Sequence, residues 1–230
     1  MNKMNKGKLI VIEGSDGTGK ETQSGILLNR LNSSGVLGKQ RAHLVSFPDY
    51  DSPAGKKIRA YLNGELGNLE EISPRNAALL YAEDRRAKKR EMEDILRRGD
   101  WIVADRYIQS NMAYQGAKIE NSAAREDFYR WLNDLEYGIF GIPKPDLVIM
   151  LKLESFVAAE HLAAREQFDI HEQDEAYLDR VRSEYEKLAS GYYKDIFSES
   201  WKTVLCTKDR KQLSRESISD EIYKIIQEIF

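Results

Sequence analysis

The sequence has little of what disulfide-linked, zinc-binding or membrane-spanning proteins need. Its 230 residues include one cysteine, Cys206, and three histidines. An internal disulfide is therefore excluded, and the histidines lack the spacing of a zinc site. No run approaches the roughly 20 apolar residues of a membrane-spanning helix, and the four from Leu9 to Ile12 are too few for a signal-peptide core. We expect a soluble, cytoplasmic chain with no membrane partner.

The charge balance is also close to neutral. Lys and Arg number 35 against 38 Asp and Glu, a net charge of −3. Such a chain has no general attraction to nucleic acid, so we expect no nucleic-acid partner and local capture of any bound anion. Hydrophobic residues make up 41% of the chain, and no repeat or linker divides it. We expect one domain over residues 1–230, with a core of ordinary size.

Short apolar runs alternate with longer amphipathic stretches. The runs that predict strands are Leu9–Ile12, Ala42–Ser46, Trp101–Ala104, Leu147–Leu151 and Thr203–Leu205. The stretches that predict helices are 19–33, 53–63, 74–98, 108–137 with breaks, 154–166, 174–191 and a last helix from about Ser214. Continuous apolar character predicts strands covered on both faces, and hence an α/β fold with a five-stranded parallel sheet flanked by helices. Ligands of such sheets bind beyond the carboxyl ends of the strands.

A glycine-rich loop follows the first predicted strand. It consists of Gly14, Ser15, Asp16, Gly17, Thr18, Gly19 and Lys20, followed by Glu21 and Thr22. The pattern is G-x-x-x-x-G-K, in which backbone N–H groups surround phosphate oxygens and the lysine reaches the terminal phosphates. A turn without a ligand would show the same spacing, but the order strand, loop, helix favours an ATP-binding phosphate loop.

The loop departs from the full motif at Glu21, where a hydroxyl residue usually ligates Mg²⁺. Thr22 is the next hydroxyl, but one step along a helix turns a side chain by about 100°. Asp105, directly after the third predicted strand, is a second candidate ligand. The sequence leaves open whether Thr22, Asp105 or carboxylates acting through water hold the metal.

The residues after the third predicted strand indicate the kind of phosphate chemistry. No N-K-x-D guanine motif is present, which argues against a GTP-binding switch. From Asp105 to Gly116 the chain reads D-R-Y-I-Q-S-N-M-A-Y-Q-G, and here it resembles the thymidylate kinases. I-E-G-x-D-G-x-G-K-x-T-Q at 12–23, F-P-x-Y at 47–50 and a lid-like stretch at about 161–173 agree in order.

The resemblance implies a P-loop kinase fold and the reaction of ATP with dTMP to ADP and dTDP, a step of dTTP synthesis, with Mg²⁺ as cofactor. It also implies a homodimer, with which the apolar segments flanking Tyr107–Gln115 are compatible. The implied catalytic positions are Lys20, Asp16, Asp105, Arg106 and Arg165. Arg106 would bind the phosphate of the monophosphate, with Asp105 orienting it, and Asp16 would accept a hydrogen bond from the sugar 3′-hydroxyl.

The same resemblance implies a substrate pocket. Tyr81 would stack on thymine, Arg85 would donate to its O4, and Tyr114 would lie against C2′ and exclude a ribose hydroxyl. The remaining substrate-binding positions are Phe47, Tyr50, Ser110, Asn111 and Gln115. Arg85 lies in a basic run whose other members are expected to form a solvated helix face.

Two departures bear on catalysis. Asp49 stands near where many relatives have an arginine, so the phosphate must rely on Tyr50, Arg106 and Arg59. Gly17 stands where one branch of the family has a catalytic arginine, which leaves the lid residue Arg165 for that role. The sequence thus also admits two alternatives: a kinase for another nucleoside or nucleoside monophosphate such as dUMP, or a nucleotide-binding regulatory module with impaired catalysis.

Overall fold

A five-stranded parallel sheet forms the centre of the molecule. The computed structural model describes residues 6–67, 71–154, 157 and 174–230. The strands are β1 (Leu9–Glu13), β2 (Ala42–Ser46), β3 (Trp101–Asp105), β4 (Leu147–Lys152) and β5 (Trp201–Leu205), in the order β2-β3-β1-β4-β5. Each neighbouring pair is parallel. The predicted α/β fold class and the five predicted strands are confirmed.

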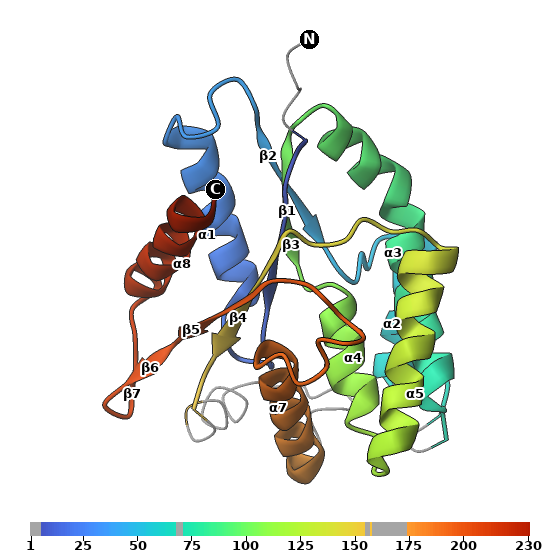
Figure 1. The fold of residues 1–230 in the computed structure, drawn as a ribbon. Coiled ribbons are helices and arrows are strands. Elements are labelled where there is room, and N and C mark those ends of the chain that lie inside the picture. Colours follow the sequence, from blue (N-terminus) through green and yellow to red (C-terminus); the bar gives the residue numbers. More distant parts are fainter. Residues whose placement is uncertain (1–5, 68–70, 155–156, 158–173) are drawn as a thin grey trace.

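Helices cover both faces of the sheet (Figure 1). The helices are α1 (Lys20–Ser33), α2 (Pro53–Leu62), α3 (Pro74–Arg97), α4 (Ile108–Gly116), α5 (Ser122–Asn133), α7 (Glu175–Ala189) and α8 (Arg215–Ile229). Helices α1 and α8 share one apolar core with the sheet, and α3, α4, α5 and α7 share a second core on the other face. The central strands β1, β3 and β4 are apolar up to their last residue, which is charged in each, because both of their faces are buried.

The outer strands differ from the expectation that all strands are covered on both faces. Leu44 of β2 is 42% exposed, and Leu205 of β5 is 59% exposed. Both strands lie at an edge of the sheet, where the flanking helices do not reach all side chains. Continuous apolar character therefore predicted strand positions correctly but overestimated burial at the edges.

The helix boundaries follow from local capping chemistry. Ser52 and Ser73 precede α2 and α3, and each side chain accepts a hydrogen bond from a backbone N–H of the first turn. A proline follows each serine, where its missing N–H costs nothing. Ser214 caps α8 in the same way. These boundaries agree with the predicted ones to within about a residue.

Two elements were not predicted. One is the π-helical geometry of Asp134–Ile139, which continues α5 and overlaps the end of the predicted helix 108–137, and the other is a hairpin of β6 (Thr207–Lys208) and β7 (Lys211–Gln212) before α8. Most of the predicted helix 154–166, and the whole predicted lid at 161–173, lie outside the described residues. None of the helices in the described ranges is long and apolar enough to cross a membrane.

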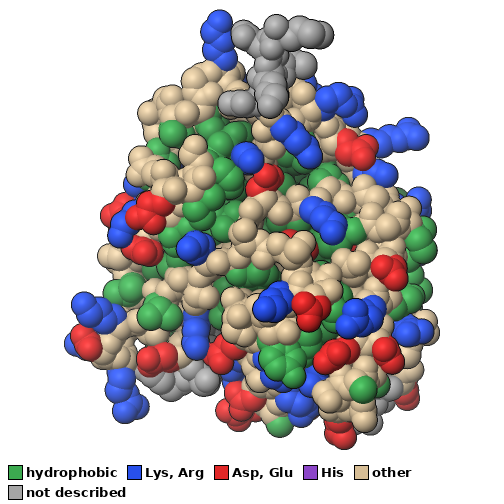
Figure 2. Space-filling model, in the orientation of Figure 1, with side chains coloured by type: hydrophobic (Ala, Val, Ile, Leu, Met, Phe, Trp, Pro, Cys, Tyr) green, Lys and Arg blue, Asp and Glu red, His purple; other side chains and the backbone are tan. Residues whose placement is uncertain are grey.

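Basic and acidic side chains are interspersed over the face of the molecule shown in Figure 2. This distribution matches the near-neutral charge balance of the sequence. Binding of a polyanion by this fold must therefore depend on a local group of charges, and such a group lies at the carboxyl ends of the strands.

Candidate active site

The phosphate loop joins β1 to α1, as predicted. Gly14 adopts φ 147°, and a Cβ there would lie 2.5 Å from the carbonyl oxygen of Leu151 on β4, so only glycine fits. Gly19 precedes α1 with φ 82°, a conformation that L side chains rarely adopt. The ammonium group of Lys20 donates to the carbonyl oxygen of Ser15 at 2.8 Å. The loop thus brings the lysine beside the first turn of α1, where the helix dipole favours an anion.

The charges around this loop perturb each other. Burial, and next the positive charge of Arg106, lower the pKa of Lys20 from 10.5 to about 8. Burial would raise the pKa of Asp16, but the charges of Arg106 and Lys20 outweigh it and hold that pKa well below its ordinary value. Lys20 and Arg106 are therefore buried beside Asp16, and the carboxylates of Glu13 and Asp105 also act on Lys20.

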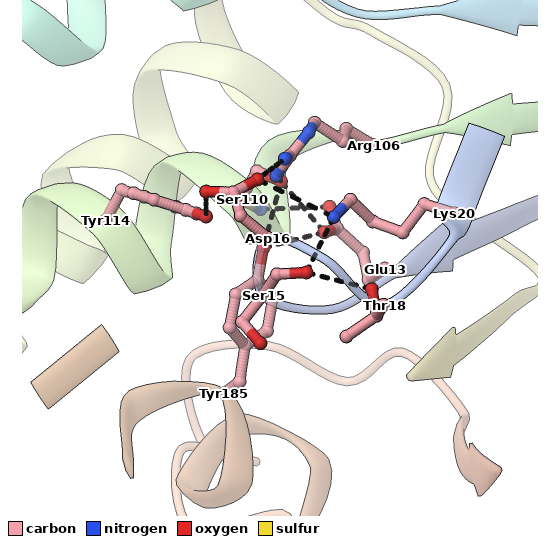
Figure 3. Close-up of polar contacts among 9 residues, drawn as sticks. All are labelled: Glu13, Ser15, Asp16, Thr18, Lys20, Arg106, Ser110, Tyr114 and Tyr185. Carbon is pink, nitrogen blue, oxygen red and sulfur yellow. Dashed lines mark hydrogen bonds and ion pairs between the residues drawn. The ribbon is translucent and has the colours of Figure 1, made fainter. Parts of the chain in front are cut away.

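Arg106 lies at the centre of the site (Figure 3). Its guanidinium donates to Asp16, and its Nη1 donates to the hydroxyl of Ser110 at 3.3 Å. The hydroxyl of Tyr114 donates to the other oxygen of Asp16. We expected Asp105 to orient Arg106, but in the described part of the chain the hydrogen bonds of the guanidinium go to Asp16 and Ser110. The backbone turns sharply at Arg106, which has φ 64°.

Asp105 ends β3 directly beside the phosphate loop. It pairs in register with Ile12 of β1 and Ser46 of β2. Its Oδ1 is buried and has no hydrogen-bond partner among the residues that the structure describes. Burial raises the pKa of this carboxyl group. Thr22 lies half-buried in the first turn of α1, and Glu21 is exposed.

A single pocket brings together all the predicted substrate-binding residues. Its lining includes Phe47, Tyr50, Tyr81, Arg85, Arg106, Ser110, Asn111, Tyr114 and Gln115. Asp16, Pro48, Leu62 and Tyr107 complete the wall. Residues from the phosphate loop, α3 and α4, far apart in the chain, thus converge on one cavity next to the phosphate loop.

Arg85 is held rigidly at one side of this pocket. Its Nε and Nη2 each donate to a carboxylate oxygen of Glu136 at 2.6 Å, and Nη1 lies 3.4 Å from the carbonyl oxygen of Tyr107. The side chains of Arg85 and Glu136 are 2% and 0% exposed. Because the guanidinium is planar and these bonds fix its orientation, its remaining N–H groups point in a fixed direction. The other basic residues of this run are partly or fully exposed, as expected.

Two buried acceptors accompany Arg85. Oδ1 of Asn111 and Oε1 of Gln115 have no hydrogen-bond partner within the described ranges. Nδ2 of Asn111 donates to the carbonyl oxygen of Ala78 at 3.0 Å, which fixes the direction of its oxygen. Buried acceptors of this kind are costly unless a ligand supplies a donor.

The loop from Phe47 to Ser52 closes another side of the pocket. Asp84 of α3 accepts hydrogen bonds from the backbone N–H of Asp49 and from the hydroxyl of Ser52. The carboxylate of Asp49 pairs with Lys88 at 3.0 Å, on the outside of the pocket. Arg59 lies over the ring of Tyr50 at 5.0 Å. Asp49, which the sequence made unfavourable for phosphate binding, is therefore directed away from the pocket. Arg59 lies beside Tyr50, which lines the pocket.

Some functional positions escaped the sequence interpretation. Glu136 was not singled out, and neither were Glu13 and Tyr185, which bond to Ser110. A signal existed for Glu13, because it is the one charged residue of the otherwise apolar strand β1. Arg165 and the rest of the lid lie outside the described residues. Cys206 forms no disulfide, as expected, and it is buried.

Comparisons with known proteins agree with this geometry. The chain is 31% identical over 189 residues to a thymidylate kinase of Mycobacterium tuberculosis, covering 79% of this chain and 86% of the relative. The structure of a thymidylate kinase from Candida albicans matches with a TM-score of 0.68 and 26% identity, covering 96% of this chain and 92% of that one. One from Ehrlichia chaffeensis, at 19% identity, shares the fold with a TM-score of 0.65 and coverage of 96% and 100%. The family model described as thymidylate kinase matches residues 12–219, and the chain therefore belongs to the thymidylate kinase family.

Proposed function

We propose that this protein transfers the γ-phosphoryl group of ATP to dTMP, giving ADP and dTDP. The observation that carries the proposal is the position of Arg106, which lines the nucleoside pocket and bonds to Asp16 of the phosphate loop. A phosphate held by Arg106 would lie beside the loop that binds the terminal phosphates of ATP. Transfer between two phosphates needs this proximity above all, because positioning and charge neutralisation supply most of the catalysis.

The polar groups of the pocket support thymine as the base. Arg85 offers a donor to a carbonyl oxygen, and the free acceptors of Asn111 and Gln115 offer a place for an N–H. Thymine and uracil have both a carbonyl at position 4 and an N–H at position 3. Cytosine has an amino group at position 4 and a nitrogen without hydrogen at position 3. Its amino donor would face the Arg85 donor, and its ring acceptor would face the amide acceptors. The methyl group that separates thymine from uracil is worth only ~1–3 kcal/mol.

The sugar and phosphate have their own partners. Tyr114 and Asp16 form the wall next to the phosphate loop, where a deoxyribose would contact the ring and donate its 3′-hydroxyl to the carboxylate. Tyr50, with Arg59 stacked on it, covers the side of the pocket on which the phosphate would lie. Asp16 accepts hydrogen bonds from Arg106 and Tyr114. The phosphate of a bound monophosphate would therefore compete with Asp16 for the guanidinium of Arg106.

Lys20 and Arg106 then act on the reacting groups. Lys20 would neutralise charge on the phosphates of ATP, and Arg106 would neutralise charge on the attacking phosphate. The oxygen of this phosphate is already negative, so it needs no separate base to make it nucleophilic. No covalent enzyme intermediate is needed. Arg165 would add a third cation from the lid; Arg165→Ala should lower kcat far more than it weakens dTMP binding, and an unchanged kcat would dismiss this role.

The residues fit a Mg²⁺ ion bound mainly through the nucleotide. The unpartnered Oδ1 of Asp105 is a hard oxygen ligand at the edge of the phosphate loop, with Thr22 as the second candidate. The described residues contain no cluster of three or more His, Cys, Asp or Glu side chains that could hold a metal without the nucleotide. Mg²⁺ typically uses one or two carboxylates together with substrate phosphates. When bound, it would neutralise charge on the phosphates of ATP.

We also propose a homodimer that packs through α2 and α3. The surface groove between these helices is lined largely by apolar atoms, including Ala54, Leu79, Leu80 and Ala87. The segments flanking Tyr107–Gln115 were found compatible with a dimer in the sequence, but most of α4 between them is buried within the subunit, so we place the proposed contact at the groove. Light scattering coupled to size exclusion should give twice the 26.5 kDa chain mass, and Leu80→Glu should halve it.

One domain, a cytoplasmic location and the absence of a nucleic-acid partner stay predictions from the sequence.

The direct test of the activity is a coupled ADP-release assay with a panel of monophosphates. Turnover with dTMP, with dTDP identified as the product, would support the proposal. Preference for another monophosphate would favour the first alternative from the sequence, and ATP binding without turnover would favour the regulatory module.

A further inference from the structure

Glu13 is a fully buried carboxylate in the last position of β1, and it takes no part in the chemistry described above. Among the described residues, its four hydrogen bonds all come from donors without a full charge. Oε1 accepts from the backbone N–H groups of Tyr107 and Ser110, at 2.8 and 2.9 Å. Oε2 accepts from the hydroxyls of Ser110 and Tyr185, each at 2.8 Å. Each of these contacts therefore connects β1 to the start of α4 or to α7, and Figure 3 shows those to Ser110 and Tyr185.

The backbone bonds of Glu13 act directly after Arg106. Helix α4 begins with no side-chain cap of its own, and Glu13 accepts from the N–H of Ser110 in its first turn and from that of Tyr107 directly before it. Arg106, one residue earlier, has φ 64°, a left-handed conformation that is unfavourable for a non-glycine residue. Such a conformation persists only where its surroundings hold it. The carboxylate of Glu13 anchors the chain on the C-terminal side of this turn and also matches the positive end of the helix dipole.

The hydroxyl contacts of Glu13 extend to the Arg106 side chain. Oε2 of Glu13, Oγ of Ser110 and the hydroxyl oxygen of Tyr185 form a triangle with sides of 2.8, 2.8 and 3.0 Å. Two hydroxyl hydrogens serve three oxygens, and an ionised carboxylate can only accept. When the Ser110 hydroxyl donates its hydrogen to Glu13, the lone pairs of the Ser110 oxygen face outward. Nη1 of Arg106 donates to this oxygen at 3.3 Å.

We propose that Glu13 is a positioning residue for phosphoryl transfer, which acts on Arg106 through Ser110 and through the first turn of α4. The proposal rests on the proposed dTMP kinase function, in which Arg106 holds the phosphate of the acceptor. Glu13 sets both the backbone turn that carries Arg106 and the polarity of the hydroxyl that orients its guanidinium. Tyr185 links the same carboxylate to α7.

Glu13→Gln tests this role with little change of shape. The amide nitrogen would face either the two N–H groups or the two hydroxyls. In the second case the hydroxyls must reverse, and the Ser110 hydrogen would then oppose Arg106. We expect KM for dTMP to rise about 10-fold while KM for ATP changes less than about twofold. A general loss of structure would change both.

Glu184→Gln is the matched control. Glu184 is also a buried glutamate, and its Oε2 accepts from the hydroxyls of Tyr129 and Tyr193, at 3.0 and 2.9 Å. Its Oε1 also pairs with Lys187 and Arg125. None of its hydrogen bonds or ion pairs in the described part of the chain goes to a residue of the pocket lining, so this variant should lose thermal stability and keep both KM values. Wild-type turnover of dTMP in the same assay separates failure of this inference from failure of the proposed function.

A double-mutant cycle decides whether Glu13 acts through Arg106. In an Arg106→Ala background, Glu13→Gln should change kcat/KM for dTMP by less than about twofold, because the group it positions is gone. If Glu13→Gln does not fold, Ser110→Ala breaks the same link and enters the same cycle. An unchanged KM for dTMP, equal changes in the two KM values, or the same loss with and without Arg106 would each overturn the proposal.

Discussion

Glu136→Gln should destabilise the protein strongly and weaken dTMP recognition at the same time. Glu136 is the counterion of Arg85, with two N–O distances of 2.6 Å and almost complete burial of both side chains. Removing one partner of a buried pair leaves an uncompensated charge and costs about 3–5 kcal/mol. A loss of about 4 kcal/mol in a chain of this size lowers Tm by roughly 8–16 °C.

Urea unfolding followed by circular dichroism measures this loss, and the coupled assay at low temperature measures KM for dTMP. The double variant Arg85→Met/Glu136→Leu serves as the control, because apolar replacement of a whole buried pair is often close to neutral in stability. The double variant should therefore regain much of the stability and still bind dTMP poorly. The reasoning would be refuted if Glu136→Gln lowered the free energy of unfolding by less than about 1 kcal/mol, or if the double variant were less stable than Glu136→Gln.

Three further predictions concern the loop, the sugar and the thiol. Lys20→Ala should lower kcat by at least about 100-fold without lowering Tm, since burial reduces the pKa of Lys20 to about 8 and its charge does not stabilise the fold; retained activity would show that the loop is not the ATP site. Tyr114→Ala should reduce the preference for deoxy over ribo monophosphates about 10-fold, whereas Tyr114→Phe, which keeps the ring, should not; an unaltered ratio in the alanine variant would contradict the steric role. Cys206, whose pKa burial raises to about 12, should not react with a disulfide reagent at pH 8 until the chain is unfolded, and fast reaction of the native protein would contradict its burial.

The parts of the site that the sequence predicted are local in the chain or lie at fixed offsets from a strand end. The phosphate loop is one continuous segment, and Tyr81 and Arg85 lie one helical turn apart. The parts that it missed depend on contacts between distant segments. Glu13 and Tyr185 are 172 positions apart, and Arg85 and Glu136 are 51 apart, so no local pattern relates them.

The same distinction applies to the fold. Strands and helices followed from apolar periodicity and capping residues, because both act over a few neighbouring positions. The β6–β7 hairpin did not, since its turn uses Asp209 and Arg210 at positive φ rather than a glycine that would have marked it. The π-helical stretch 134–139 has no distinct sequence signature, and its Glu136 pairs with Arg85, which is distant in the chain.

The ratio of kcat/KM for dTMP to that for dCMP, measured with the wild-type protein, tests the central claim most directly. The claim is that a fixed Arg85 and the free acceptors of Asn111 and Gln115 select a base with a carbonyl and an N–H. A mismatch at buried polar groups is heavily penalised, so the account predicts a ratio of at least about 100. A ratio near one, or faster turnover of dCMP, would contradict it.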